Sequence, residues 1–294
     1  MTQTPITHNL TANGLQMRCL EWTRADHPES QGGRSTVLLL HGLTSCAETW
    51  SLVAPALAEG LRVLAPDLRG HGETDKPDGG YDYQSICRDL VGLLDGLGVE
   101  KTAVAGHSWG ASIGALMAAD YPQRVNRLAL VDGGFFRMAS SGEPTPDRLE
   151  GMLAPLSIYA SRQTYLAAVR QGLPGPWTPE LEAIALASIY HNPDGSVREK
   201  LDREHQKLIL RATWEARSQD HLGRVRCPTL LLPSESSDPM LEERMARKRA
   251  GVEEAARRLP ECTVHWVPDS VHDVQLHRPE AVAEALRGFF GEAL

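Results

Sequence analysis

The sequence lacks any run of apolar residues long enough to cross a bilayer, although 41% of its 294 residues are hydrophobic. It also lacks a surplus of basic residues. The 38 acidic and 30 basic residues give a formal net charge of -8, which repels a phosphate backbone. These two absences exclude a membrane-spanning protein and argue against nucleic acid as a partner.

Paired cysteines, metal-ligand spacings and a secretory leader are absent too. The five cysteines are odd in number and widely spaced, and the first residues, MTQTPITHNLTANGLQM, contain neither a basic nor an apolar leader region. Gly70-His71-Gly72 lacks the strand, spacing and acid of a nucleotide-binding loop. We therefore expect a protein of the reducing cytoplasm that uses no metal and no cofactor.

The sequence contains short apolar runs that alternate with helix-like stretches. Because apolar and polar residues do not alternate strictly within them, these runs are typical of strands buried on both faces of a mostly parallel sheet. Residues 15–22 (LQMRCLEW) alternate imperfectly and predict an antiparallel hairpin at the sheet edge. The predicted parallel strands are 36–40, 62–65, 102–105, 127–131, 229–232 and 263–267.

Residues 133–224 interrupt this alternation of apolar runs and helix-like stretches. They show no convincing strand, but Thr178-Pro179 places an N-cap before a first-turn proline, and Gly172 can end a helix that begins near Ser161. A chain of this length favours one large domain with an insertion. The predicted organisation is an α/β core from residues 1–132 and 225–294, interrupted by a helical cap at 133–224.

The segment VAGHSWGASIG, residues 103–113, carries the strongest chemical signal. A buried strand ends at Ala105 and a helix-compatible run follows, so the chain turns from strand to helix at Ser108. Small residues are required where strand and helix nearly touch, and Gly106 and Gly110 supply them. Such a bend exposes the serine hydroxyl beside the free N–H groups of a helix N-terminus.

This arrangement resembles the α/β-hydrolase family, and the resemblance covers nearly all of the chain. His41-Gly42, which closes the TVLLL strand, is similar to the family's oxyanion-loop motif. APDLRGHGETDKP (65–77) resembles the next strand and loop, and PDSVHDVQLHRPEAV (268–282) resembles the carboxy-terminal histidine segment. The resemblance implies an α/β-hydrolase sheet with the helical cap inserted after strand 6.

Family membership would give each of these residues a role. Ser108 is the expected nucleophile, and His272 is the expected base because a neutral imidazole can take the serine proton near neutral pH. The expected oxyanion donors are the backbone N–H groups of Leu43 and Trp109. His41 and Gly42 would support the oxyanion loop.

The acid that orients the histidine is harder to choose. LLLPSESSDPM resembles the family's segment after a strand, where an acid usually precedes a proline, so Asp238 is the first choice. The segment is one residue longer than usual, which leaves Glu235 open. Asp132, at the end of the preceding strand, is the location used in some relatives. Capping a turn is a commoner role for a loop aspartate than catalysis.

The residue at the bend selects the reaction class. Family members that open epoxides or displace halide resemble this chain in the cap and in the strand-to-helix bend, called the nucleophile elbow. They have an aspartate at the position of Ser108, whereas a serine implies an acyl-enzyme. We expect a serine hydrolase that cleaves carboxylic esters of small apolar molecules. Carbon–carbon bond hydrolysis of the meta-cleavage type and a slow-turnover ligand receptor are the alternatives. A homodimer is compatible with the sequence.

Overall fold

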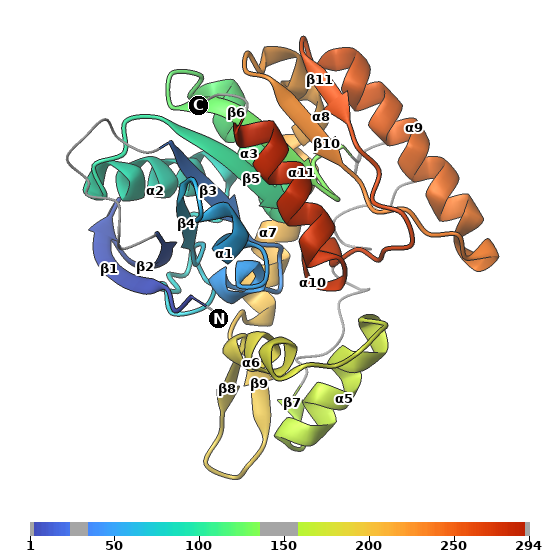
Figure 1. Cartoon of the computed structure of the whole chain (residues 1–294). Coiled ribbons are helices and arrows are strands. Elements are labelled where there is room, and N and C mark those ends of the chain that lie inside the picture. The colour runs from blue at the N-terminus through green and yellow to red at the C-terminus, as the bar shows by residue number, and fades with distance from the viewer. Residues whose placement is uncertain (1–2, 24–34, 136–157, 292–294) are drawn as a thin grey trace.

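An eight-stranded sheet forms the centre of the computed structural model, which describes residues 3–23, 35–135 and 158–291 (Figure 1). The strand order is β1-β2-β4-β3-β5-β6-β10-β11. The strands are β1 (Ile6–Ala12), β2 (Leu15–Trp22), β3 (Thr36–Leu40), β4 (Arg62–Pro66), β5 (Thr102–His107), β6 (Val125–Val131), β10 (Thr229–Leu232) and β11 (Cys262–Val264).

The sheet is parallel except at one edge. β1 pairs antiparallel with β2, and β2 pairs antiparallel with β4, while all other neighbours are parallel. The predicted edge hairpin and the predicted mostly parallel sheet are both confirmed. The central strands are apolar on both faces because both are covered: every residue of β3 and β5 is buried.

Helices cover the two faces of the sheet and create two separate hydrophobic cores. One core packs beneath α2 (Tyr83–Gly96), α3 (Trp109–Asp120) and α9 (Glu242–Arg258). The other packs beneath α1 (Ala54–Leu57) and α11 (Pro279–Gly291). Short helical segments complete the core: η1 (Ala47–Trp50), η3 (Pro239–Leu241) and α10 (Val274–His277).

The part of the cap that the structure describes follows β6, as predicted; residues 136–157 lie outside the described residues, and the boundaries at 133 and 224 stay predictions. Its helices are α5 (Arg162–Gly172), α6 (Pro179–Ala187), α7 (Arg203–Ala216), α8 (Ser218–His221) and η2 (Leu222–Arg224). The helix predicted to begin near Ser161 and end at Gly172 is confirmed as α5, whose N-cap Ser161 accepts from the N–H of Thr164. The N-cap predicted at Thr178 also forms, and it accepts from the N–H of Leu181.

The expectation of a strand-free cap is wrong. Three short strands, β7 (Ile158–Tyr159), β8 (Ile189–His191) and β9 (Val197–Glu199), form a small antiparallel sheet in the order β7-β9-β8. Val197 and Ile189 from this sheet pack with Tyr165 of α5 and Ala185 of α6. The cap therefore has a small apolar core of its own.

Two backbone segments approach closely where β5 turns into α3. A Cβ atom added to Gly106 would lie 2.2 Å from the carbonyl oxygen of Gly110, and one added to Gly110 would lie 2.5 Å from the carbonyl oxygens of Leu40 and His41. No side chain fits at either position without moving backbone. The two glycines therefore let the helix start directly above the sheet.

We predict that Gly106→Ala lowers the free energy of unfolding by about 1–3 kcal/mol, because the new methyl group forces α3 away from β5. Gly60→Ala is the matched control, since no atom lies within 4 Å of its added Cβ; it should change stability by less than about 0.5 kcal/mol. Urea unfolding measures both. Equal stability of the two variants would contradict the close contact.

Candidate active site

Ser108 sits at the bend between β5 and α3 in a backbone conformation that side-chain-bearing residues rarely adopt. Its φ is 54° and its ψ is -115°. The surroundings hold it there: its N–H donates to the carbonyl of Val131 at 3.0 Å, and a Cβ on Gly133 would lie 2.3 Å from its carbonyl oxygen. Strain of this kind is found where a side chain must be presented in a fixed direction.

A chain of hydrogen bonds links Ser108 to a histidine and an aspartate. His272 Nε2 lies 2.9 Å from Ser108 Oγ, and His272 Nδ1 lies 2.7 Å from Asp132 Oδ2. Asp132 is buried with 1% of its side chain exposed, whereas 42% of the His272 side chain is exposed. The three side chains come from the ends of β5 and β6 and from the loop before α10. This is the geometry of a nucleophile, its base and an orienting acid.

In the structure the carboxylate hydrogen-bonded to His272 belongs to Asp132 and not to Asp238, the first choice for the acid. Asp238 lies on the surface, and its carboxylate accepts a hydrogen bond from the N–H of Met240 at 2.9 Å as the cap of η3. Glu235 is half-buried and pairs with Arg249 at 3.5 Å. Asp132 takes the position instead because β6 is the immediate neighbour of β5, so its carboxyl end lies beside Ser108.

The second oxygen of Asp132 is held by a buried cation. Lys248 Nζ, on α9, lies 2.8 Å from Asp132 Oδ1 and also donates to Ser234 O at 3.0 Å and Ser234 Oγ at 2.6 Å. The N–H of Ser234 donates to Asp132 Oδ1 at 2.9 Å. Burial by itself would raise the pKa of Asp132, but the hydrogen bond from His272 and the charge of Lys248 outweigh it and hold that pKa at about 2.

The loop after β3 is fixed by His41. Its Nδ1–H donates to the carbonyl of Gly42 at 2.8 Å, while its Nε2 accepts from the N–H of Leu68 at 3.0 Å, and burial lowers the pKa of the ring to about 4. In a trans peptide the carbonyl and the next N–H point in opposite directions. Holding the Gly42 carbonyl toward His41 therefore turns the Leu43 N–H away from it.

The two expected oxyanion donors border the same cavity as Ser108. Leu43 and Trp109 both line it, and in the described part of the chain no protein group accepts from either backbone N–H. Trp109 is the first residue of α3, where helical N–H groups have no partner within the helix. His71 supports both residues: its Nε2 lies 2.5 Å from the Leu43 carbonyl, and its ring stacks on that of Trp109.

The backbone beside His272 is anchored through His107, whose Nε2–H donates to the His272 carbonyl at 2.8 Å. Gln275 donates to His107 Nδ1 at 3.4 Å and to Thr49 Oγ1 at 3.0 Å. Burial lowers the pKa of His107, which keeps its ring neutral and able to accept at Nδ1. The loop that carries His272 is therefore tied to the elbow and to η1.

A cavity of about 190 Å³ opens above Ser108 between the core and α7. It is small beside the roughly 300–1,000 Å³ of pockets for drug-sized ligands. Its lining residues come from the oxyanion loop, the elbow, the end of β6 and α7: Leu43, Ser108, Trp109, Ser112, Asp132, Gly133, Gly134, Leu210, Thr213, Arg217 and His272. The end of α7 and Arg217 thus line this cavity from the cap side.

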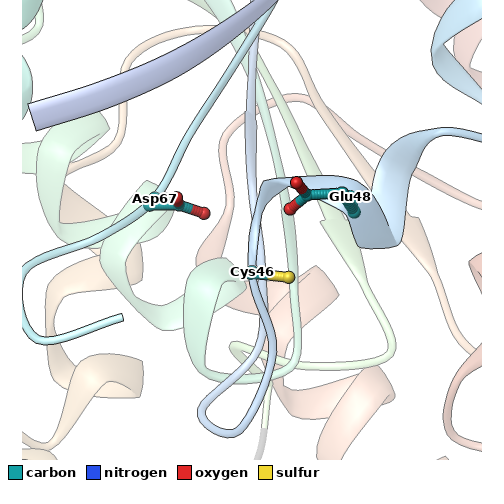
Figure 2. A group of neighbouring side chains, drawn as sticks. All are labelled: Cys46, Glu48 and Asp67. Carbon is teal, nitrogen blue, oxygen red and sulfur yellow. The ribbon is translucent and has the colours of Figure 1, made fainter. Parts of the chain in front are cut away.

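Cys46, Glu48 and Asp67 bring three ligand-type atoms within 4.8 Å of one another, with the two carboxylates pointing toward each other (Figure 2). These groups do not suit a metal ion. Arg18 binds both carboxylates, with Nε 2.6 Å from Asp67 and Nη1 and Nη2 each 2.8 Å from Glu48. Burial raises the pKa of Cys46 well above its usual range, so it stays a thiol rather than the thiolate that metals bind.

This cluster is a structural anchor for the oxyanion loop. Asp67 accepts from the N–H of Ala47 at 2.8 Å and from that of Glu73 at 2.8 Å, and a Cβ on Gly72 would lie 2.1 Å from its carboxylate. Arg18 therefore neutralises the Asp67 carboxylate, which connects the loop after β4 to the first residue of η1.

A parallel α/β sheet with this Ser-His-Asp chain at its carboxyl edge defines a hydrolase of the nucleophile-elbow class. A family model described as alpha/beta hydrolase fold matches residues 35–276, and the chain belongs to this family. The resemblance found from the sequence is confirmed. No described helix has the length and apolar character needed to cross a membrane.

Known proteins of several activities resemble the chain. The soluble epoxide hydrolase of Corynebacterium sp. (strain C12) is 38% identical over 130 residues, which span 44% of this chain and 42% of that protein. A protein of Caulobacter sp. (strain K31) whose name proposes carbamate hydrolysis is 28% identical over 91% of this chain and 95% of its own. The crystal structure of E-2-(acetamidomethylene)succinate hydrolase superimposes with a TM-score of 0.77 at 22% identity, covering 98% and 99% of the two chains, which shows a shared fold.

Sequence reasoning missed Lys248, Gln275 and Gly133. Lys248 lies within EERMARKRAGVEEAARR, where a lysine is indistinguishable from its exposed neighbours. Gln275 follows His272 by three residues, but its partners come from distant segments. The sequence did contain an indication for Gly133, because this glycine directly follows Asp132 at the end of the strand beside the nucleophile elbow.

We predict that Lys248→Met lowers the free energy of unfolding by about 3–5 kcal/mol, because it leaves the buried Asp132 carboxylate without its cation. Arg247→Met is the control, since its neighbouring ion pair with Glu243 is exposed and should contribute about 0–1 kcal/mol. The double variant Lys248→Met/Asp132→Asn should recover part of the loss. Chemical denaturation measures all three, and equal effects of the two single substitutions would contradict the buried pair.

The depressed pKa of Asp132 also predicts a pH dependence of stability. A carboxyl whose pKa is lowered by folding stabilises the protein above its ordinary pKa of 3.8, and that contribution is lost as the pH falls toward about 2. It amounts to about 2 kcal/mol. The advantage of the wild type over Asp132→Asn in urea unfolding should therefore shrink by this amount between pH 5 and about pH 2. A constant advantage over that range would mean that Asp132 keeps its ordinary pKa.

Proposed function

We propose that the protein is a serine hydrolase that cleaves carboxylic esters through an acyl-enzyme. The observation that carries this proposal is the continuous contact from Ser108 Oγ to His272 Nε2 at 2.9 Å and from His272 Nδ1 to Asp132 Oδ2 at 2.7 Å. A serine hydroxyl is a weak nucleophile near neutral pH and needs a base in this position. Asp132 fixes the Nδ1–H tautomer, which leaves Nε2 free to accept the serine proton.

The reaction then follows in two steps. Ser108 Oγ forms a bond to the ester carbonyl carbon while its proton moves to His272. The bond between the carbonyl carbon and the alcohol oxygen then breaks, and the alcohol leaves with the proton from His272. Water attacks the acyl-serine in the second step, gives a proton to His272, and releases the carboxylic acid as Ser108 recovers its hydrogen. The Leu43 and Trp109 N–H groups stabilise the negative oxygen of both tetrahedral intermediates.

The serine itself separates this proposal from epoxide opening, although an epoxide hydrolase is among the relatives. An epoxide opened by a serine would give an ether, which has no carbonyl for water to attack. An epoxide opened by an aspartate gives an ester, which water can cleave. Ser108 is therefore suited to acyl transfer, and the esters are the simplest acyl donors.

We predict that Ser108→Ala lowers kcat for p-nitrophenyl butyrate by on the order of 10⁵–10⁶-fold without unfolding the protein. Release of p-nitrophenol measures the rate, and thermal melting checks the fold. Near-normal turnover in this variant would rule out the acyl-enzyme.

Replacing the acids separates the three candidates. Asp132→Asn should reduce kcat about 10⁴-fold, because the amide stabilises the wrong histidine tautomer. Asp238→Asn and Glu235→Gln should leave kcat unchanged, since neither side chain contacts His272. A larger fall for Asp238→Asn than for Asp132→Asn would show that the acid is assigned wrongly.

A further inference from the structure

One cation, Arg217, lines the cavity above Ser108 and has no partner among the residues that the structure describes. Arg217 is among the residues that border the cavity, and its guanidinium makes no hydrogen bond or ion pair with any described residue. The other charged side chain there, Asp132, already has Lys248 as its counter-ion. Among the described residues, this positive group in the cavity therefore has no counter-ion.

The backbone at Arg217 is unusual for a residue with a side chain. Arg217 separates α7 from α8 in the left-handed conformation, with φ 44° and ψ 59°. Glycine is the common choice at this position after a helix, because other residues pay a steric penalty there. An arginine in this conformation agrees with a functional use of its side chain.

Arg217 lines the cavity together with two residues of α7. Leu210 and Thr213 lie three positions apart on one face of that helix, and Arg217 is the residue that ends it. The Thr213 hydroxyl already donates to the carbonyl of Ile209 at 2.7 Å. Of the residues at this end of α7 that line the cavity, Arg217 therefore carries a polar group with no partner in the described part of the chain.

We propose that Arg217 binds a carboxylate of the substrate, so that the preferred substrates are esters that also carry a free carboxylate. This inference rests on the proposed ester hydrolysis and names its substrate class. A guanidinium forms two parallel hydrogen bonds with a carboxylate, which adds direction to the attraction between charges. The cavity of about 190 Å³ suits a substrate with a short chain.

This substrate class differs from the small apolar esters expected from the sequence. The apolar part of that expectation still fits Leu43, Trp109 and Leu210, which provide the carbon-lined walls of the cavity. The charged end of the substrate is the added element. Arg217 was not singled out from the sequence because a single arginine in RATWEARSQDHLGR has no distinguishing pattern.

Two matched esters test the proposal. Ethyl pentanoate and monoethyl glutarate release the same alcohol and differ in a terminal methyl group against a terminal carboxylate. The wild type should cleave monoethyl glutarate with a kcat/KM higher by on the order of tenfold to a hundredfold, the range expected of a charged hydrogen-bonded pair. Ethanol release measures both reactions. An equal or lower kcat/KM for monoethyl glutarate would overturn the proposal.

Substitution of Arg217 should remove this preference selectively. Arg217→Asn keeps a residue that tolerates the left-handed backbone; it should lower kcat/KM for monoethyl glutarate, chiefly through KM, and change that for ethyl pentanoate little. Arg217→Lys should retain part of the preference. Arg162→Asn is the control, since Arg162 is an exposed cap arginine paired with Glu182 and does not line the cavity. Equal losses for both esters in Arg217→Asn would mean a structural role only.

A binding measurement separates failure of this proposal from failure of the proposed function. Calorimetric titration of Ser108→Ala with glutarate should show binding that weakens at least tenfold in Ser108→Ala/Arg217→Asn. That result supports the carboxylate site even if the wild type cleaves neither ester, in which case ester hydrolysis alone is wrong. Ethyl ester cleavage with no effect of Arg217→Asn on glutarate binding would leave the hydrolase intact and overturn the role of Arg217.

Discussion

The whole site depends on the close approach of two backbones at the turn from β5 to α3. Gly106 and Gly110 leave no space for a side chain, so the first turn of α3 sits directly on the ends of the central strands. That contact forces Ser108 into its positive φ and lifts its hydroxyl above the sheet. The same contact places the N–H of Trp109 at the free start of a helix, where it is available to stabilise negative charge. The positive φ of Ser108 and the free N–H of Trp109 thus arise at the same close contact.

Charged and polar side chains form a continuous row through the site, from Lys248 to Asp132, His272 and Ser108. Lys248 neutralises one oxygen of Asp132 from behind, and His272 uses the other oxygen on the side of the serine. A buried carboxylate without either partner would be costly, and both together keep it ionised. His107 and Gln275 fix the backbone of His272 from a different direction. The imidazole is therefore held by two independent sets of contacts, although its own side chain is partly exposed.

Much of this organisation is visible in the sequence because it is local. The strands at 36–40 and 229–232 were predicted at their observed bounds, since short apolar runs between helical patterns have few other interpretations. Ser108 and His272 were placed by motifs whose meaning depends on the adjacent strand and helix. The three cap strands were missed because segments of two or three residues are too short for any periodicity.

The choice between Asp132 and Asp238 could not be made locally. Both residues follow strands of the same parallel sheet, and only the order β5-β6-β10 shows that the end of β6 is adjacent to Ser108. Lys248 is invisible for a similar reason, because its partner Asp132 is 116 positions away. Arg217 is invisible because it lines a cavity with Ser108 and Trp109, which are distant in the sequence. Pairing across the sheet and the fold of the cap over it decide these contacts.

The most direct test of the account is covalent labelling with a fluorophosphonate, which reacts with a serine only when a base activates its hydroxyl. Intact-mass measurement should show one adduct per chain, and peptide mapping should place it on Ser108, with a much slower reaction in His272→Ala. Absence of labelling in folded protein, or an adduct on any other residue, would contradict the central claim that the fold activates Ser108.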